Sequence, residues 1–243
     1  HLAPWPANWP KGASNAWALA EGATDTGGAI LANDPHLEFS APIMWYLARV
    51  ETPKWTAMGA TVPGVPFFIL AQTGTHAWGM TSTQSDIEDL FIEKLSPDEP
   101  DRYLIPGGSE KFRVRKETIK VKGGDDVKLT VRSTRHGPVI SDLRPRSKEL
   151  AGDGFVVALS ATYLKKGDRT ADAFYALVRA ENWNTFKSAL QLFRGPQQNF
   201  FFADTNGTIG FIAAGWVPIR RRGNGFVPTE GWTGETDWRD VVA

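Results

Sequence analysis

Short apolar runs separated by turn residues predict a chain built mainly from β-strands. The runs at 15–20 and 28–33 flank the turn-rich sequence EGATDTG, which predicts a pair of neighbouring strands. Further strands are predicted at 43–50 and 67–71, the second directly after two prolines that favour a tight turn.

Two longer segments carry the pattern of β-hairpins. Residues 111–135 alternate polar and apolar side chains on both sides of the sequence GGDD. Residues 198–215 contain two apolar runs joined by Asn206 and Gly207, a dipeptide that strongly favours a hairpin turn.

The pattern changes in the last third of the chain. Residues 170–180 and 184–194 place apolar side chains three and four positions apart and begin with residues that cap helices well. Two helices are therefore predicted there, and the fold class is α+β, dominated by strands, with short helices inserted late.

Composition narrows the function classes. The 243 residues include 27 basic and 27 acidic ones, and this zero net charge argues against a nucleic-acid partner. The absence of cysteine excludes disulfides, thiolate metal sites and a cysteine nucleophile. No apolar run approaches the roughly 20 residues of a membrane helix. Because the sequence starts with His1 instead of methionine, we expect it to be a piece of a longer protein.

Common catalytic motifs are absent from the sequence. It contains no GxSxG, Walker, GxGxxG or HExxH pattern, and its four histidines are too scattered to predict a zinc site. One of them, His136, is explained adequately by the turn and strand around it. Composition and periodicity alone leave the function undecided.

Four segments together resemble the penicillin acylase family of N-terminal nucleophile hydrolases, in the family's order and near its spacing. They are SNAWALA, LANDPHL, the stretch 59–95 that contains HAWGMTSTQSDIEDLF, and NFFFADTNGTIGFIAAGWVPIR at 199–220. The resemblance implies the four-layer αββα sandwich of these hydrolases. It also implies that 1–13 is the end of a spacer peptide and that 14–243 is the N-terminal part of a β-chain catalytic domain.

In this family a precursor is cut before a serine, and the matching bond here joins Ala13 to Ser14. A serine hydroxyl needs a base, and a free α-amine, whose pKa is about 7.7–8.0, can serve as that base at neutral pH. The new N-terminal residue then supplies both nucleophile and base. Taken on its position alone, Ser14 would be a turn or cap serine.

The resemblance assigns the oxyanion donors by residue match. Asn199 corresponds to the family's side-chain donor, and Ser82 lies where the family offers a backbone N–H, with Thr83 as the neighbouring candidate. Without that match, Asn199 would be interpreted as a strand residue satisfied by backbone contacts.

Two further residues match supporting positions of the family's active site. His36 corresponds to a residue that helps to hold the serine and its amine, although a histidine after proline is equally typical of a partly buried turn. Arg220 falls near a supporting arginine, but 220–222 are all arginines and could form a solvated turn.

The acidic sequence SDIEDLF matches the family's calcium site. Asp86 and Asp89 correspond to its two carboxylates, and Glu88 to a position that contributes its main-chain carbonyl. A further family ligand comes from the α-chain, which this sequence lacks. The alternative is a solvated acidic turn.

The implied activity is hydrolysis of a linear N-acyl amide through an acyl-enzyme on Ser14. A penicillin or cephalosporin side chain, an acyl-homoserine lactone or another N-acyl compound could be the substrate, and no organic cofactor is expected. The resemblance implies that the chain pairs with an α-chain from the same precursor. It also implies a periplasmic or secreted location for the protein. With 1–13 attached and the α-chain absent, we expect this piece to be inactive. A calcium-stabilised, β-rich carbohydrate-binding module is the alternative.

Overall fold

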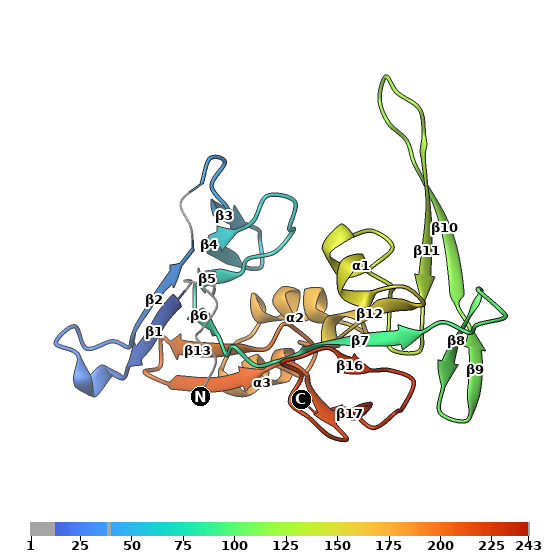
Figure 1. Ribbon diagram of the computed structural model, residues 1–243. Helices are drawn as coiled ribbons and strands as arrows, with labels where there is room; N and C mark the ends of the chain where they lie inside the picture. Colours follow the sequence, from blue (N-terminus) through green and yellow to red (C-terminus); the bar gives the residue numbers. More distant parts are fainter. Residues whose placement is uncertain (1–12, 38–39, 243) are drawn as a thin grey trace. The chain divides into compact units, whose positions relative to one another are not determined.

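The computed structural model describes residues 13–37 and 40–242 (Figure 1). The chain divides into two compact units. Unit 1 contains the described residues up to 85 together with 167–216, and unit 2 contains 86–166 and 217–242.

A six-stranded antiparallel sheet forms the centre of unit 1. Its strand order is β14-β13-β6-β5-β4-β3, so strands from both parts of the chain meet at the β6–β13 pair. The strands are β3 (Tyr46–Glu51), β4 (Thr56–Thr61), β5 (Leu70–Thr73), β6 (His76–Ser82), β13 (Gln198–Asp204) and β14 (Ile209–Ala214).

Two helices, α2 (Thr170–Leu177) and α3 (Trp183–Leu190), cover one face of this sheet (Figure 1). Alternate residues of β6 and β13, such as Trp78 and Phe202, point into a core that they share with the helices. Phe186 of α3 is fully buried there, 4.9 Å from the Phe202 ring centre. Asn182 starts α3 with a capping box.

A hairpin of β1 (Ala13–Leu19) and β2 (Ile30–His36) lies against the opposite face of the sheet, and the short helix η1 (Glu21–Ala23) follows β1. Contact is close at Gly79 of β6, where an added Cβ would come within 2.7 Å of the Asn33 side chain. Unit 1 therefore shows three layers, which are the helices, the sheet and the hairpin.

Unit 2 is built around a three-stranded sheet of β12 (Phe155–Ala161), β7 (Glu88–Lys94) and β16 (Thr229–Glu230). The remaining strands pair as three two-stranded sheets. These strands are β8 (Arg102–Ile105) with β9 (Gly108–Lys111), β10 (Arg113–Ile119) with β11 (Val127–Ser133), and β15 (Val217–Arg220) with β17 (Trp238–Val242). Helix α1 (Pro145–Ala151) and the short helix η2 (Thr162–Leu164) complete the unit.

The predicted α+β class with few helices is confirmed, as are the first strand pair, both hairpins and both helices, with somewhat different ends. The strand predicted at 67–71 is wrong at its start, because β5 begins only at Leu70. Phe67 lies in a loop and stacks on Phe174 of α2 with ring centres 4.8 Å apart. The Thr61 hydroxyl holds this loop by donating to the Val65 and Phe67 carbonyls.

Residues 1–12 of the predicted spacer lie outside the described residues. In the described part of the chain, none of the helices combines the length and the apolar character needed to cross a membrane.

Candidate active site

Ser14 is the second residue of β1 and faces the sheet of unit 1. Along β1 the even-numbered residues are half-buried and the odd-numbered ones exposed. The β1–β2 register places Ser14 opposite Pro35 and Ala16 opposite Asn33. Because directly opposed residues point to the same side of a sheet, Ser14 lies on the same face as Asn33, which contacts β6.

Asn199 faces the hairpin from the other side. It lies opposite Thr81 of β6, and its Nδ2 donates to Thr81 Oγ1 at 3.1 Å. Its neighbour Phe200 is buried in the core on the helix side. Since side chains alternate along a strand, Asn199 and Thr81 point toward the hairpin layer.

Two contacts fix the direction in which the hairpin crosses the sheet. At its turn end, Glu21 lies beside Gly207, in the turn between β13 and β14. Nearer its open end, Asn33 binds the main chain of Met80, the residue before Thr81. Ser14 lies two residues, or about 7 Å, beyond the position opposite Asn33. The structure therefore brings Ser14 and Asn199 to facing layers at the same end of the sheet.

The predicted backbone donors also lie at this end. Ser82 is the last residue of β6, opposite Gln198, and Thr83 follows it. Gln84 has a φ of 53°, a left-handed conformation that is uncommon for a residue other than glycine. The Gln84 N–H donates to Ser82 Oγ at 3.1 Å. The chain thus turns sharply directly after the predicted donors.

His36 lies opposite Ala13, so its main chain is beside the bond between Ala13 and Ser14. Its imidazole Nε2 is 2.5 Å from Asp34 Oδ2, on the exposed side of the hairpin. The ring and the Ser14 side chain belong to opposite faces, because the register alternates between them. Any effect of His36 on Ser14 therefore goes through its main chain or through a rearranged ring.

Arg220 lies in unit 2 and binds the predicted calcium ligands. Its Nε donates to Asp89 Oδ2 at 2.8 Å, and its Nη2 donates to Asp89 Oδ1 at 3.1 Å and to the Asp86 carbonyl at 3.0 Å. The Trp238 indole N–H also donates to Asp89. Only 12% of the Arg220 side chain and 6% of that of Asp89 are exposed. The alternative of solvated turns therefore fails for both residues.

This arrangement does not fit a calcium ion, which takes six to eight oxygen ligands. Both carboxylate oxygens of Asp89 accept from nitrogen donors. Asp86 Oδ2 is buried 3.4 Å from Arg220 and has no hydrogen bond to any of the described residues. Burial raises the pKa of the Asp86 carboxyl against the opposing effect of Arg220. In 13–37 and 40–242, no cluster of three or more His, Cys, Asp or Glu is placed to hold a metal. Calcium stays a prediction.

A buried polar network in unit 2 escaped the sequence analysis. His136 Nδ1 is 2.7 Å from Glu93 Oε1, and its Nε2 is 2.9 Å from Asp237 Oδ1. Arg135 binds the other oxygen of Asp237, and the Phe91 ring stacks on the imidazole with centres 3.7 Å apart. The partners of His136 are 43 and 101 residues away, so no local pattern could have predicted them. Its contacts agree with a structural role.

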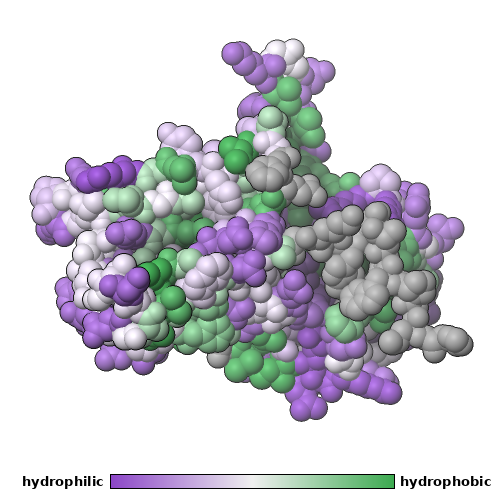
Figure 2. Space-filling model, turned by 90° about the vertical axis from the view of Figure 1, so that its left-hand side faces the viewer, coloured by the Kyte–Doolittle hydropathy of each residue, from purple (hydrophilic) through white to green (hydrophobic). Residues whose placement is uncertain are grey.

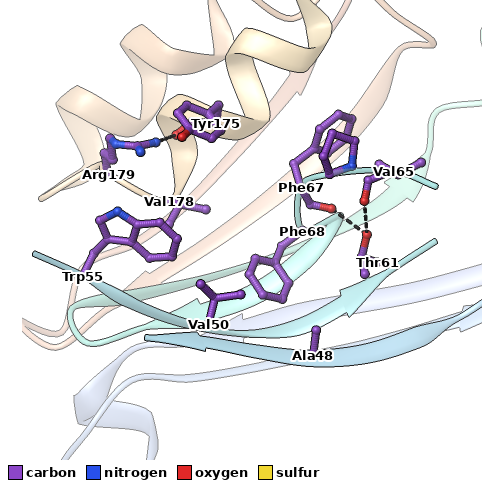
Figure 3. Close-up of a pocket in the computed structure, with 11 residues that line it drawn as sticks. Ala48, Val50, Trp55, Thr61, Val65, Phe67, Phe68, Tyr175, Val178 and Arg179 are labelled. Atoms are coloured by element: carbon purple, nitrogen blue, oxygen red, sulfur yellow. Dashed lines mark hydrogen bonds between the residues drawn. The ribbon is translucent and has the colours of Figure 1, made fainter. Parts of the chain in front are cut away.

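An apolar pocket of about 330 Å³ lies on the helix side of the unit 1 sheet (Figure 3). Ala48 and Val50 of β3 form its floor, and Arg179 lies over the Tyr175 ring, 3.9 Å from its centre. Asn199 points to the opposite face of the same sheet, so this pocket is separate from the Ser14 site. Its other lining residues are Trp55, Thr61, Val65, Pro66, Phe67, Phe68 and Val178.

Comparison with known proteins places these residues in a family context. The chain is 35% identical over 226 residues to the acyl-homoserine lactone acylase QuiP of Pseudomonas fluorescens (strain Pf0-1), covering 93% of this chain and 27% of that protein. It is 35% identical over 239 residues to the penicillin acylase 2 proenzyme of Pseudomonas sp. (strain SE83), covering 95% of this chain and 29% of the relative. The chain therefore spans less than a third of the length of these relatives.

A solved structure shares the fold. The thermostable penicillin G acylase from Alcaligenes faecalis matches 94% of this chain and 40% of its own, with a TM-score of 0.78 and 24% identity. The sequence profile of the penicillin amidase family matches residues 2–243. On that match, the chain belongs to the penicillin amidase family.

Proposed function

We propose that the protein containing this chain is an amidohydrolase that cleaves a linear N-acyl amide, with Ser14 as its N-terminal nucleophile. The observation that carries the proposal is the placement of Ser14 and Asn199 on facing layers at one end of the sheet. Family membership and the acylase names of two relatives support the reaction class.

In the proposed reaction, the free α-amine of Ser14 takes the hydroxyl proton as Oγ attacks the amide carbonyl carbon. The negative charge that develops on the carbonyl oxygen is met by Asn199 Nδ2 and by a backbone N–H at Ser82 or Thr83. The C–N bond then breaks, and the α-ammonium returns its proton to the leaving amine. Water hydrolyses the resulting ester on Ser14, which releases the acid.

The same hydroxyl can free its own amine. Attack of Ser14 Oγ on the Ala13 carbonyl converts the peptide bond into an ester, and hydrolysis of that ester separates Ala13 from Ser14. The pairing of Ala13 with His36 supports this step because it holds the peptide bond in a fixed strand. In the proposal, His36 contributes through its main chain and Arg220 through structural support.

We further propose that other parts of the protein complete the sandwich and bind the apolar surface of unit 1. The outer face of the β1–β2 hairpin exposes Trp17, and the edge strand β3 exposes Tyr46 and Leu47. On the face drawn in Figure 2, hydrophobic residues reach the surface in several places between hydrophilic ones. The proposed partner is an α-chain from the same precursor. The proposed location of the protein is periplasmic or secreted.

The names of two relatives, an acyl-homoserine lactone acylase and a penicillin acylase, are the support for the substrate class. An N-acyl compound of either kind is proposed. The alternative of a calcium-stabilised carbohydrate-binding module loses part of its support, because Arg220 contacts the acidic pair that would hold the calcium.

Mass spectrometry of the full-length expressed protein tests this proposal. We expect cleavage between Ala13 and Ser14 in the wild type and in the control Ser188→Ala, an exposed serine on α3. Ser14→Ala should stay intact and should not hydrolyse a panel of N-acyl amides. A folded wild-type protein that remains uncut and inactive would refute the proposal.

A further inference from the structure

Asn33, in the middle of β2, uses its side-chain amide entirely on main-chain atoms. Its Oδ1 accepts from the Met80 N–H at 2.9 Å, and its Nδ2 donates to the Met80 carbonyl at 3.2 Å. The same Nδ2 donates to the Asn15 carbonyl at 2.8 Å. One amide group therefore joins β6 to the residue that directly follows Ser14.

The side-chain amide of Asn33 forms the hydrogen bonds with the Met80 main chain that a neighbouring strand would otherwise form. The pairing of β5 with β6 joins Ala71 to Trp78 and Gln72 to Ala77, so Met80 lies beyond it. A side-chain amide offers one acceptor and two donors, much like a peptide group, and can satisfy both main-chain groups of a strand residue. Asn33 does so for Met80.

Gly79 provides the space for this contact. A Cβ at that position would lie 2.7 Å from Asn33 Cβ and 2.8 Å from Asn33 Oδ1, closer than van der Waals contact allows. A side chain on residue 79 would therefore push the amide away from Met80. The glycine and the asparagine act together as one contact.

The contact lies between the two halves of the proposed catalytic site. On one side Asn15 is bonded to Ser14, and on the other Met80 is bonded to Thr81, whose hydroxyl accepts from Asn199. The path from nucleophile to oxyanion donor thus runs through Asn33. The β1–β2 hairpin and the six-stranded sheet are separate sheets, so within 13–37 and 40–242 no backbone ladder fixes the spacing between them.

We infer that Asn33 is a positioning residue that sets the distance between the Ser14 hydroxyl and the oxyanion donor of Asn199. It acts through Asn15 and Met80 and does not touch the substrate. The inference rests on the proposed function and adds the element that aligns its two halves. A displacement of the reacting atoms by roughly 1 Å can cost about 100-fold in rate, so losing the amide should reduce kcat strongly.

The test uses Asn33→Asp, Asn33→Ala and Gly79→Ala in the full-length protein. The aspartate variant would keep the shape of the side chain but turn an oxygen toward the carbonyls of Met80 and Asn15, which repel it. Each variant should cut more slowly at Ala13–Ser14. Once cut, each should show kcat roughly 10- to 100-fold below wild type on a chromogenic N-acyl anilide, with little change in KM.

Asn182→Ala is the matched control. It also removes an asparagine whose side chain binds main-chain groups in unit 1, but it does so at the start of α3. It should lower the melting temperature, Tm, without changing kcat or the cutting rate. If Asn33→Ala does not fold, Asn33→Asp and Gly79→Ala decide by the same criteria.

Two results would overturn the inference. One is a kcat within threefold of wild type in the folded Asn33 and Gly79 variants. The other is a kcat loss that Asn182→Ala reproduces at the same drop in Tm. A wrong proposed function would give a different result from a wrong role for Asn33, because the wild type itself would then stay uncut and inactive.

Discussion

Replacing Arg220 by glutamine tests whether an internal cation neutralises the acidic pair of unit 2. The variant removes two hydrogen bonds to Asp89 and one to the Asp86 carbonyl. Asp89 is then left buried with the Trp238 N–H and with Asp86 nearby. Breaking a buried ion pair from one side typically costs about 3–5 kcal/mol, because the remaining charge stays out of water.

Arg222→Gln is the matched control, because the same change is made two residues away at an exposed position. Arg222 is 78% exposed and lies 3.5 Å from Glu235, an ion pair of the kind that contributes about 0–1 kcal/mol. The expected cost is therefore about 3–5 kcal/mol for Arg220→Gln and no more than about 1 kcal/mol for Arg222→Gln, so Tm should fall clearly in the first variant and little in the second.

The assay is thermal unfolding of the full-length protein, followed by circular dichroism with millimolar calcium or with a chelator. Wild-type Tm should be the same in both, since Arg220 occupies the pair. In Arg220→Gln the freed oxygens of Asp86 and Asp89 could accept calcium, so added calcium should raise Tm in that variant alone. Equal Tm values for the two variants would refute the reasoning about the ion pair. A wild-type Tm that falls on chelation would show that the acids hold calcium instead.

Three further substitutions have outcomes that the described contacts predict. Asn199→Ala should lower kcat by about 10²–10³ with little change in KM, measured by steady-state kinetics of the cut enzyme; an unchanged kcat would remove Asn199 from the oxyanion site. Burial acts to raise the pKa of the Asp237 carboxyl, but Arg135 and His136 outweigh it and lower that pKa, so its stabilisation is present above the unfolded pKa of about 3.9 and is lost as pH falls through the lower folded value. Asp237→Asn should therefore lower Tm at neutral pH and much less at strongly acidic pH, and a Tm difference independent of pH would contradict this. Phe186→Ala, at a fully buried position on α3, should cost about 3–5 kcal/mol in denaturant unfolding, whereas the exposed Phe226→Ala should cost little.

Local patterns predicted the elements whose partners are close in sequence. The alternation of polar and apolar residues on both sides of 123–124 is enough to predict the β10–β11 hairpin, and the turn at 206–207 is enough to predict the β13–β14 hairpin. Each hairpin depends only on its own turn residues and its own alternation. The pairing of β6 with β13 was beyond such reasoning. Thr81 and Asn199 are 118 residues apart, and nothing in either strand identifies the other. The apolar run predicts Phe67 and Phe68 as strand residues, because the pattern is the same for residues that pack within a sheet and for loop residues that pack onto a helix.

The acidic pair and Arg220 show how two ambiguous sequence features resolve each other. From the sequence alone, the acidic stretch and the three successive arginines are each typical of a solvated turn, because clusters of charged residues usually lie at the protein surface. The structure buries Asp89 and Arg220 against one another, and a charge that leaves water must be compensated at short range. Arg220 provides that compensation with a bidentate contact, which a fixed guanidinium fork makes well. A cation that satisfies the acids in this way also competes with a metal for the same oxygens. For that reason the Tm of Arg220→Gln with and without calcium, and not the number of acids in the sequence, distinguishes the two cations.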